Sequence, residues 1–215
     1  MEYSLKLSAI PNQSSNEIIQ KSKLVQNLLQ NFNLLKNSTI EFPKIDMKIS
    51  KPRWHASLNR ILKSGYKGHL SFQNRGDLGG VAMYDDRVTL YFNPLRIDYE
   101  FILNQVFPES IKVFSPYRAC IVDLDLGIKD VRVIGIKDIR KEIDRIQIVD
   151  YIDEAYCKVY FDKNSDDIIR ILSNQVHEVR KFHNGVIVTL FDKPMKQDEL
   201  EELSNLTLAK LKKKY

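Results

Sequence analysis

The chain has little of the residues on which small secreted and fibrous proteins depend. Its 215 residues include only two cysteines, Cys120 and Cys157, with 8 glycines and 7 prolines. Two cysteines are too few for a disulfide framework or for a zinc site built on thiolates. So little glycine and proline excludes a collagenous chain, and 43% apolar with 28% charged residues is the composition of an ordinary globular protein.

Long hydrophobic runs are also missing. The longest uncharged apolar stretch of note, residues 185–191, is far shorter than the roughly 18 residues that a membrane-spanning helix needs. Residues 1–7 have neither a basic region nor an apolar core, so we expect no signal peptide. These absences predict a soluble, cytoplasmic protein that has no membrane partner and keeps its cysteines reduced.

The length predicts one large domain or two small ones. No Gly/Ser linker or charge block divides the chain, so we expect a single domain over residues 1–215. The alternative is a pair of subregions, 1–126 and 127–215. The predicted fold class is α+β, with mixed or antiparallel sheets packed against about five helices. The C-terminal end is expected to run strand, helix, strand, helix.

The elements follow from the spacing of apolar residues, which repeats every two residues in strands and every 3.6 in helices. Strands are expected at 2–10, 117–125, 131–136, 156–161 and 186–191. A hairpin is expected over 81–92, with its turn at Asp85-Asp86. Helical patterns cover 14–36, 54–62, 99–107, 137–146, 165–179 and 198–211. Ser14 with Glu17 is a capping box at the start of the first and most clearly periodic helix.

No catalytic set, metal site or cofactor is expected from the motifs. The four histidines, which are His55, His69, His177 and His183, lack metal-ligand spacing, and no nucleophile elbow occurs. The best candidate for chemistry is the pair Asp123 and Asp125. If both lie in one strand, their carboxylates share a face and could bind a hard cation or act as an acid/base pair. The alternative is that both simply lie at an exposed strand end.

The segment from residue 47 to residue 76 contains seven basic residues and no acidic one. They are Lys48, Lys51, Arg53, Arg60, Lys63, Lys67 and Arg75. Trp54, Tyr66 and Phe72 are interspersed among them, and cations combined with stacking rings are typical of proteins that bind single-stranded nucleic acid. The alternative is a solvated face, with Trp54 in the core.

The opposite charge gathers in residues 150–154. Asp150, Asp153 and Glu154 accompany Tyr151, with no base between Ile148 and Cys157. Carboxylates with an aromatic anchor suit a protein partner that has a basic groove. These four residues are therefore the predicted partner-binding site. The alternative is a solvated turn.

The order of the expected elements resembles that of a family of bacterial immunity proteins. A strand and a long helix open the chain, and the single tryptophan, Trp54, precedes the glycine-rich loop at Gly79-Gly80 and a hairpin. The chain closes with the strand Gly185–Leu190, a proline-containing turn and a leucine-periodic helix. This plan is similar to that of the immunity proteins of polymorphic toxin systems, in particular those grouped as immunity protein 52.

The resemblance implies a non-enzymatic protein that binds one cognate toxin, often a nuclease, and blocks it inside the producing cell. A protein that blocks a nuclease would be expected to be acidic, whereas this chain carries a net charge of +5. The resemblance therefore directs attention to the acidic stretch, or to a toxin that is not a nuclease. Our first hypothesis is this immunity role by steric occlusion. The second is nucleic-acid binding through residues 47–76, and the third is a metal-dependent enzyme.

Overall fold

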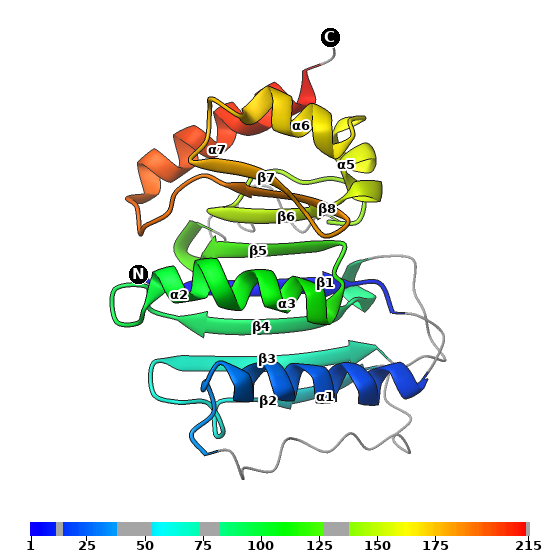
Figure 1. The fold of residues 1–215 in the computed structure, drawn as a ribbon, viewed down its shortest axis with the longest axis vertical. Helices are drawn as coiled ribbons and strands as arrows, with labels where there is room; N and C mark the ends of the chain where they lie inside the picture. Colours follow the sequence, from blue (N-terminus) through cyan, green and yellow to red (C-terminus); the bar gives the residue numbers. More distant parts are fainter. Residues whose placement is uncertain (12–14, 38–52, 74–81, 127–137, 214–215) are drawn as a thin grey trace.

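The computed structural model describes residues 1–11, 15–37, 53–73, 82–126 and 138–213. Within them, eight strands form one sheet in the order β2-β3-β4-β1-β5-β6-β8-β7, and each neighbouring pair is antiparallel (Figure 1). The strands are β1 (Tyr3–Ala9), β2 (Arg53–Ser57), β3 (Tyr66–Gln73), β4 (Asp86–Phe92), β5 (Arg118–Asp123), β6 (Val149–Asp153), β7 (Glu178–Phe182) and β8 (Gly185–Thr189). The α+β class with an antiparallel sheet is thus confirmed.

The helices form two groups, one for each half of the sheet. The first group is α1 (Ser15–Asn31) and a continuous helical segment made of α2 (Tyr99–Phe101), the π-helix η2 (Ile102–Val106) and α3 (Phe107–Phe114). The second is α5 (Glu154–Phe161), α6 (Ser165–Leu172) and α7 (Gln197–Lys212). A 3-10 turn, η1 (Ala82–Tyr84), precedes β4.

The two groups lie on opposite faces of the sheet. Lys112 of α3 lies 5.8 Å from the centre of the Phe182 ring on β7. The neighbouring residue of β7, Lys181, forms an ion pair of 3.1 Å with Asp166 of α6. Successive side chains of a strand point to opposite faces, so α3 and α6 lie on opposite sides of β7.

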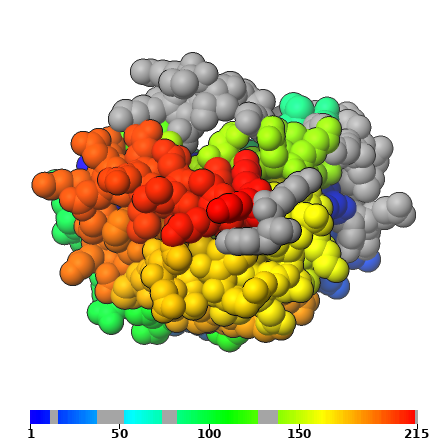
Figure 2. Space-filling view, turned by 90° about the horizontal axis from the view of Figure 1, so that it is seen from above, coloured from blue at the N-terminus to red at the C-terminus, as the bar shows by residue number. Residues whose placement is uncertain are grey.

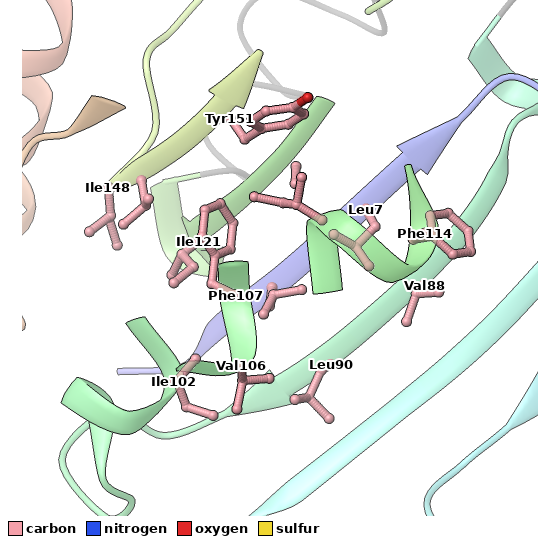
Figure 3. Packing of buried hydrophobic residues seen from close by; sticks show 14 of the residues in the cluster. Leu7, Val88, Leu90, Ile102, Val106, Phe107, Phe114, Ile121, Ile148 and Tyr151 are labelled. Carbon is pink, nitrogen blue, oxygen red and sulfur yellow. The ribbon is translucent and has the colours of Figure 1, made fainter. Parts of the chain in front are cut away.

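A core of buried apolar side chains lies between the sheet and the first helix group. Leu5 and Leu7 of β1 alternate toward this face and pack with Ile121 of β5 and with Val106 and Phe107 of the helical segment (Figure 3). One continuous cluster of buried apolar side chains extends from there into the second half of the sheet. The predicted strands and helices at β1, α1, β5, β8 and α7 are present in the structure.

The prediction of a strand over 156–161 is wrong, because these residues form α5. Cys157, Tyr160 and Phe161 are the buried residues of this segment, and their spacing is that of one helix face. Asp153 caps the N-terminus, and Asp162 ends the helix in the left-handed conformation with φ 57°. These local signals favour a helix over the two-residue alternation that the same segment also contains.

Two predictions in the first half are also wrong. The segment around Trp54 is strand β2 and not helical, since Trp54 stacks on Phe72 of β3 with ring centres 5.7 Å apart. Asp85 and Asp86 do not form an exposed hairpin turn, because both are fully buried and Asp86 begins β4. Lys21 forms an ion pair with Asp86, and Arg140 forms one with Asp85. Both cations are distant in the sequence, so the local sequence does not show that the two charges are compensated.

The remaining predictions concern a helix that is absent, a helix that ends early, and three features outside the described residues. Residues 138–146 form turns and irregular backbone where a helix was expected. The helix that begins at Ser165 ends at Leu172, so His177 precedes β7 and is not helical. The expected strand at 131–136, the cap at Ser14 and the loop at Gly79-Gly80 lie outside the described residues.

Candidate functional site

The predicted acidic contact is largely internal. Asp150 is fully buried, and its carboxylate accepts two hydrogen bonds from Arg118 of β5, with lengths of 2.8 and 3.1 Å. Tyr151 is 1% exposed and lies in the core between α3 and the sheet (Figure 3). The interpretation of these two residues as an accessible contact is therefore wrong. Residues 149–153 are a central strand of the sheet and not a solvated turn.

Asp153 and Glu154 are partly exposed, but both have structural partners. Asp153 accepts a hydrogen bond of 2.9 Å from the backbone N–H of Ala155 and so caps α5. Glu154 accepts hydrogen bonds from the backbone and the hydroxyl of Ser165, and these join the first turn of α5 to that of α6. Their carboxylates thus hold two helix starts in place.

The structure separates the basic residues of segment 47–76. Lys48, Lys51 and Arg75 lie outside the described residues. Arg60 and Lys63 lie in the connection between β2 and β3. Only Arg53 and Lys67 lie in strands, Arg53 in β2 and Lys67 in β3. Strand alternation and register place these two on the same face of the sheet, away from the first helix group.

This face, which we call the ring face, carries three rings in a row across neighbouring strands. The rings are His55 of β2, His69 of β3 and Tyr91 of β4. The centres of His55 and His69 are 5.1 Å apart, and those of His69 and Tyr91 are 5.7 Å apart. Trp54 and Phe72 point to the opposite face, where they pack in the core. The row of rings therefore differs from the set of aromatic residues that the sequence suggested.

Two further cations adjoin the rings. Lys6 of β1 and Arg87 of β4 lie on the ring face in register with the row. Burial lowers the pKa of His69 below its usual 6.5, and the positive neighbours His55, Lys6 and Arg87 act in the same direction. Among the described residues the ring face thus carries several cations, and the carboxylate of Glu2 lies near Tyr91. Sequence reasoning missed Lys6 and Arg87 because they become neighbours of segment 47–76 only through strand pairing.

The opposite end of β4 and the start of β5 share a buried ionic cluster. Asp85 accepts hydrogen bonds from the Tyr117 hydroxyl, at 2.6 Å, and from the Arg140 Nε, at 2.7 Å. The Tyr117 ring stacks on Tyr156 of α5, with centres 4.4 Å apart. The cluster ties three distant segments together. Its carboxylate is fully buried, so we assign it a structural role.

The pair Asp123 and Asp125 does not form the site that alternation suggested. Asp123 is the last residue of β5 and is buried, and its Oδ1 accepts a hydrogen bond of 2.9 Å from the backbone N–H of Asp125. Asp125 follows the strand, so the two carboxylates do not share a strand face. Among the described residues, no group of three or more His, Cys, Asp or Glu side chains is placed to hold a metal ion.

Comparisons with known proteins give a likeness of fold. No family model matches the chain, and no curated protein matches it. A solved structure, the Pseudomonas aeruginosa T6SS protein PA0821, superposes with a TM-score of 0.54 at 8% sequence identity. The match covers 97% of this chain and 83% of that protein. In the described part of the chain, no helix is both long and apolar enough to cross a membrane.

Proposed function

We propose that the chain is a non-enzymatic, cytoplasmic protein of the immunity type, which binds one cognate protein toxin and neutralises it by steric occlusion. The observation that supports this most is the similarity of fold, over nearly the whole chain, to a protein named for the T6SS, the type VI secretion system. The order of elements that resembles immunity protein 52 agrees with it. The proposal needs no cofactor, because occlusion depends on a surface alone.

The test combines capture with protection. The tagged chain captures partners from a lysate of its own host, and each captured protein is then expressed in a neutral bacterial host, alone and with the chain. We expect one protein that arrests growth alone and permits growth in the presence of the chain. The purified pair is expected to bury about 1,200–2,000 Å². Growth arrest that persists beside abundant, folded chain would contradict the proposal.

The ring face supports a second candidate function, binding of single-stranded nucleic acid. Rings spaced across a sheet can stack on bases, and cations at their margins neutralise phosphates. Here the row formed by His55, His69 and Tyr91 is bordered by Lys67 and Lys6. This arrangement combines cations with stacking rings, as the basic segment suggested. His55, Lys67 and His69 belong to that segment, whereas Lys6 and Tyr91 join them through strand pairing.

The two candidates are separated by salt dependence. If the ring face binds a single-stranded oligonucleotide, affinity falls with salt, and Lys67→Ala lowers the slope of log K against log salt by about 0.7. Lys158→Ala is the matched control, because Lys158 is exposed on α5, on the other half of the sheet. Equal slopes for the two variants, or no binding at low salt, would remove this candidate and leave the immunity proposal as it stands.

A further inference from the structure

A groove of about 510 Å³ lies at the end of the sheet where α2 faces the start of β7. Three separate segments line it. The first is the helical turn 99–104, the second is His177 with Glu178, and the third runs from Thr189 to Pro194 at the end of β8. Figure 1 shows α2 and the segment between β8 and α7 at the same end of the sheet.

The lining of the groove is mainly acidic. Glu100, Glu178 and Asp192 contribute three exposed carboxylates, and Lys193 contributes one ammonium. His177 lies near this set, with its Nε2 3.8 Å from a carboxylate oxygen of Asp192. Arg180, outside the lining, forms an ion pair of 3.2 Å with Glu178. Among the described lining residues, three carboxylates face one ammonium, and Glu100 and Asp192 have no permanent cation paired with them in this way, which favours a cationic occupant.

A buried hydroxyl in the groove wall has no partner. Tyr99 is 6% exposed and lines the groove, and its hydroxyl makes no hydrogen bond with any residue that the structure describes. Burial raises the pKa of Tyr99, and the charges of Tyr3 and Asp192 act in the same direction. The hydroxyl thus lies within electrostatic reach of a groove carboxylate. An unsatisfied buried hydroxyl is unfavourable unless a bound group supplies the missing hydrogen bond.

The backbone at the groove is also unusual. Leu103 and Asn104 line it, and both belong to the π-helix η2. π-Helical turns are rare, and they occur frequently at functional sites. The π-helix ends at Val106, and the regular α-helix α3 begins at Phe107. The irregular turn therefore coincides with the groove.

We propose that this groove binds an arginine side chain presented by a protein partner. The proposal rests on the immunity-type function above and names the chemistry of one contact. A guanidinium carries five N–H donors in a planar fork, so it can reach carboxylates such as Glu178 and Asp192 and also the Tyr99 hydroxyl. A lysine ammonium has three donors at a single point and matches this spread of acceptors less well.

The first test uses the free chain and a defined probe. N-acetyl-arginine amide is titrated into the isotope-labelled protein, and chemical shifts are followed by NMR, with the lysine and citrulline analogues as comparators. We expect arginine to shift resonances of residues 99–104, 177–178 and 189–194, and citrulline, which lacks the charge, to leave them unchanged. Equal shifts with citrulline, or no arginine shifts in these segments, would overturn the proposal.

Variants assign the contacts. Glu178→Gln and Tyr99→Phe are each expected to weaken arginine binding at least about 5-fold, because each removes one acceptor for a guanidinium donor. Glu199→Gln on α7 is the matched control, since this exposed carboxylate lies outside the groove lining. An unchanged affinity in both groove variants would overturn the assignment of the groove.

The toxin assay separates this proposal from the function on which it rests. Protection that survives in Glu178→Gln and Tyr99→Phe, together with no arginine binding, would reject the groove and keep the immunity role. Arginine binding at the groove without any protected toxin would keep the groove and reject the immunity role.

Discussion

Arg118 and Asp150 show how strongly single residues constrain this fold. Both side chains are buried, and the pair spans neighbouring strands. Removing one partner leaves an uncompensated buried charge. We expect Arg118→Met to lower the free energy of unfolding by about 3–5 kcal/mol in urea denaturation. The double variant Arg118→Met/Asp150→Leu should recover most of this loss, and a double variant no more stable than the single one would contradict the explanation.

His69 gives a residue-level prediction for pH. Its pKa in the folded protein lies below 6.5, first because of burial and then because of His55, Lys6 and Arg87. As the pH falls through 6.5, the unfolded chain therefore binds more protons than the folded one, and stability decreases. Urea midpoints measured from pH 7.5 to 5.5 should fall in the native protein and fall less steeply in His69→Gln. Parallel curves would show that other groups cause the decrease.

At the scale of elements, Gly185 fixes how β8 passes β6. A Cβ at this position would lie 2.2 Å from the backbone oxygen of Ile152 and 2.8 Å from the Cα of Asp153. Both are main-chain atoms, so the strands must separate to accept a side chain. Gly185→Ala is expected to lower the free energy of unfolding by about 1–3 kcal/mol in denaturant titration. Ser173→Ala, at an exposed site after α6, should have little effect.

The N-terminal cap of α5 gives Asp153 a structural role. Asp153 belongs to the predicted partner-binding site, and in the structure its carboxylate accepts a hydrogen bond in the first turn of the helix. Asp153→Ala should therefore lower the free energy of unfolding by about 1 kcal/mol, as measured by thermal unfolding. An unchanged melting temperature would mean that the N-terminal turn does not depend on this hydrogen bond.

Elements were predictable where one periodicity dominated. The helix α1 has one helical pattern over 17 residues, and β8 is a continuous run of buried residues, whereas the sequences of α5 and β2 fit both periodicities. The buried Asp85 was read as a turn residue, because its partner Arg140 is 55 positions away in the sequence. The local sequence could not show that this charge is compensated.

The candidate surfaces were less predictable than the elements. The ring face depends on the pairing of β2, β3 and β4, and a change of register by one residue would turn its rings into the core. The groove is assembled from segments around residues 100, 178 and 192. The spacing of residues in the sequence does not show which distant segments come into contact. Only the types of charged and aromatic residues, and not their arrangement, could therefore be predicted.

At the scale of the whole molecule, the continuous sheet and core predict one cooperative unfolding transition. Two native probes can test this. Trp54 reports on strand β2 at one edge, and Cys157 reports on α5, where burial raises the pKa of its thiol to about 12. In a Cys120→Ala background, tryptophan fluorescence and thiol labelling should change at the same urea concentration. Separate midpoints would favour the division at 126/127.

The strand order also determines how the protein behaves when concentrated. In the described chain, the sheet ends at β2 and β7, which are five residues each. The edge strand β7 carries three charged residues, Glu178, Arg180 and Lys181, and a second copy aligned against it would have to desolvate them. Short, charged edges discourage strand-by-strand growth between molecules. We therefore expect the two edge strands, β2 and β7, to hinder fibril formation by the folded protein.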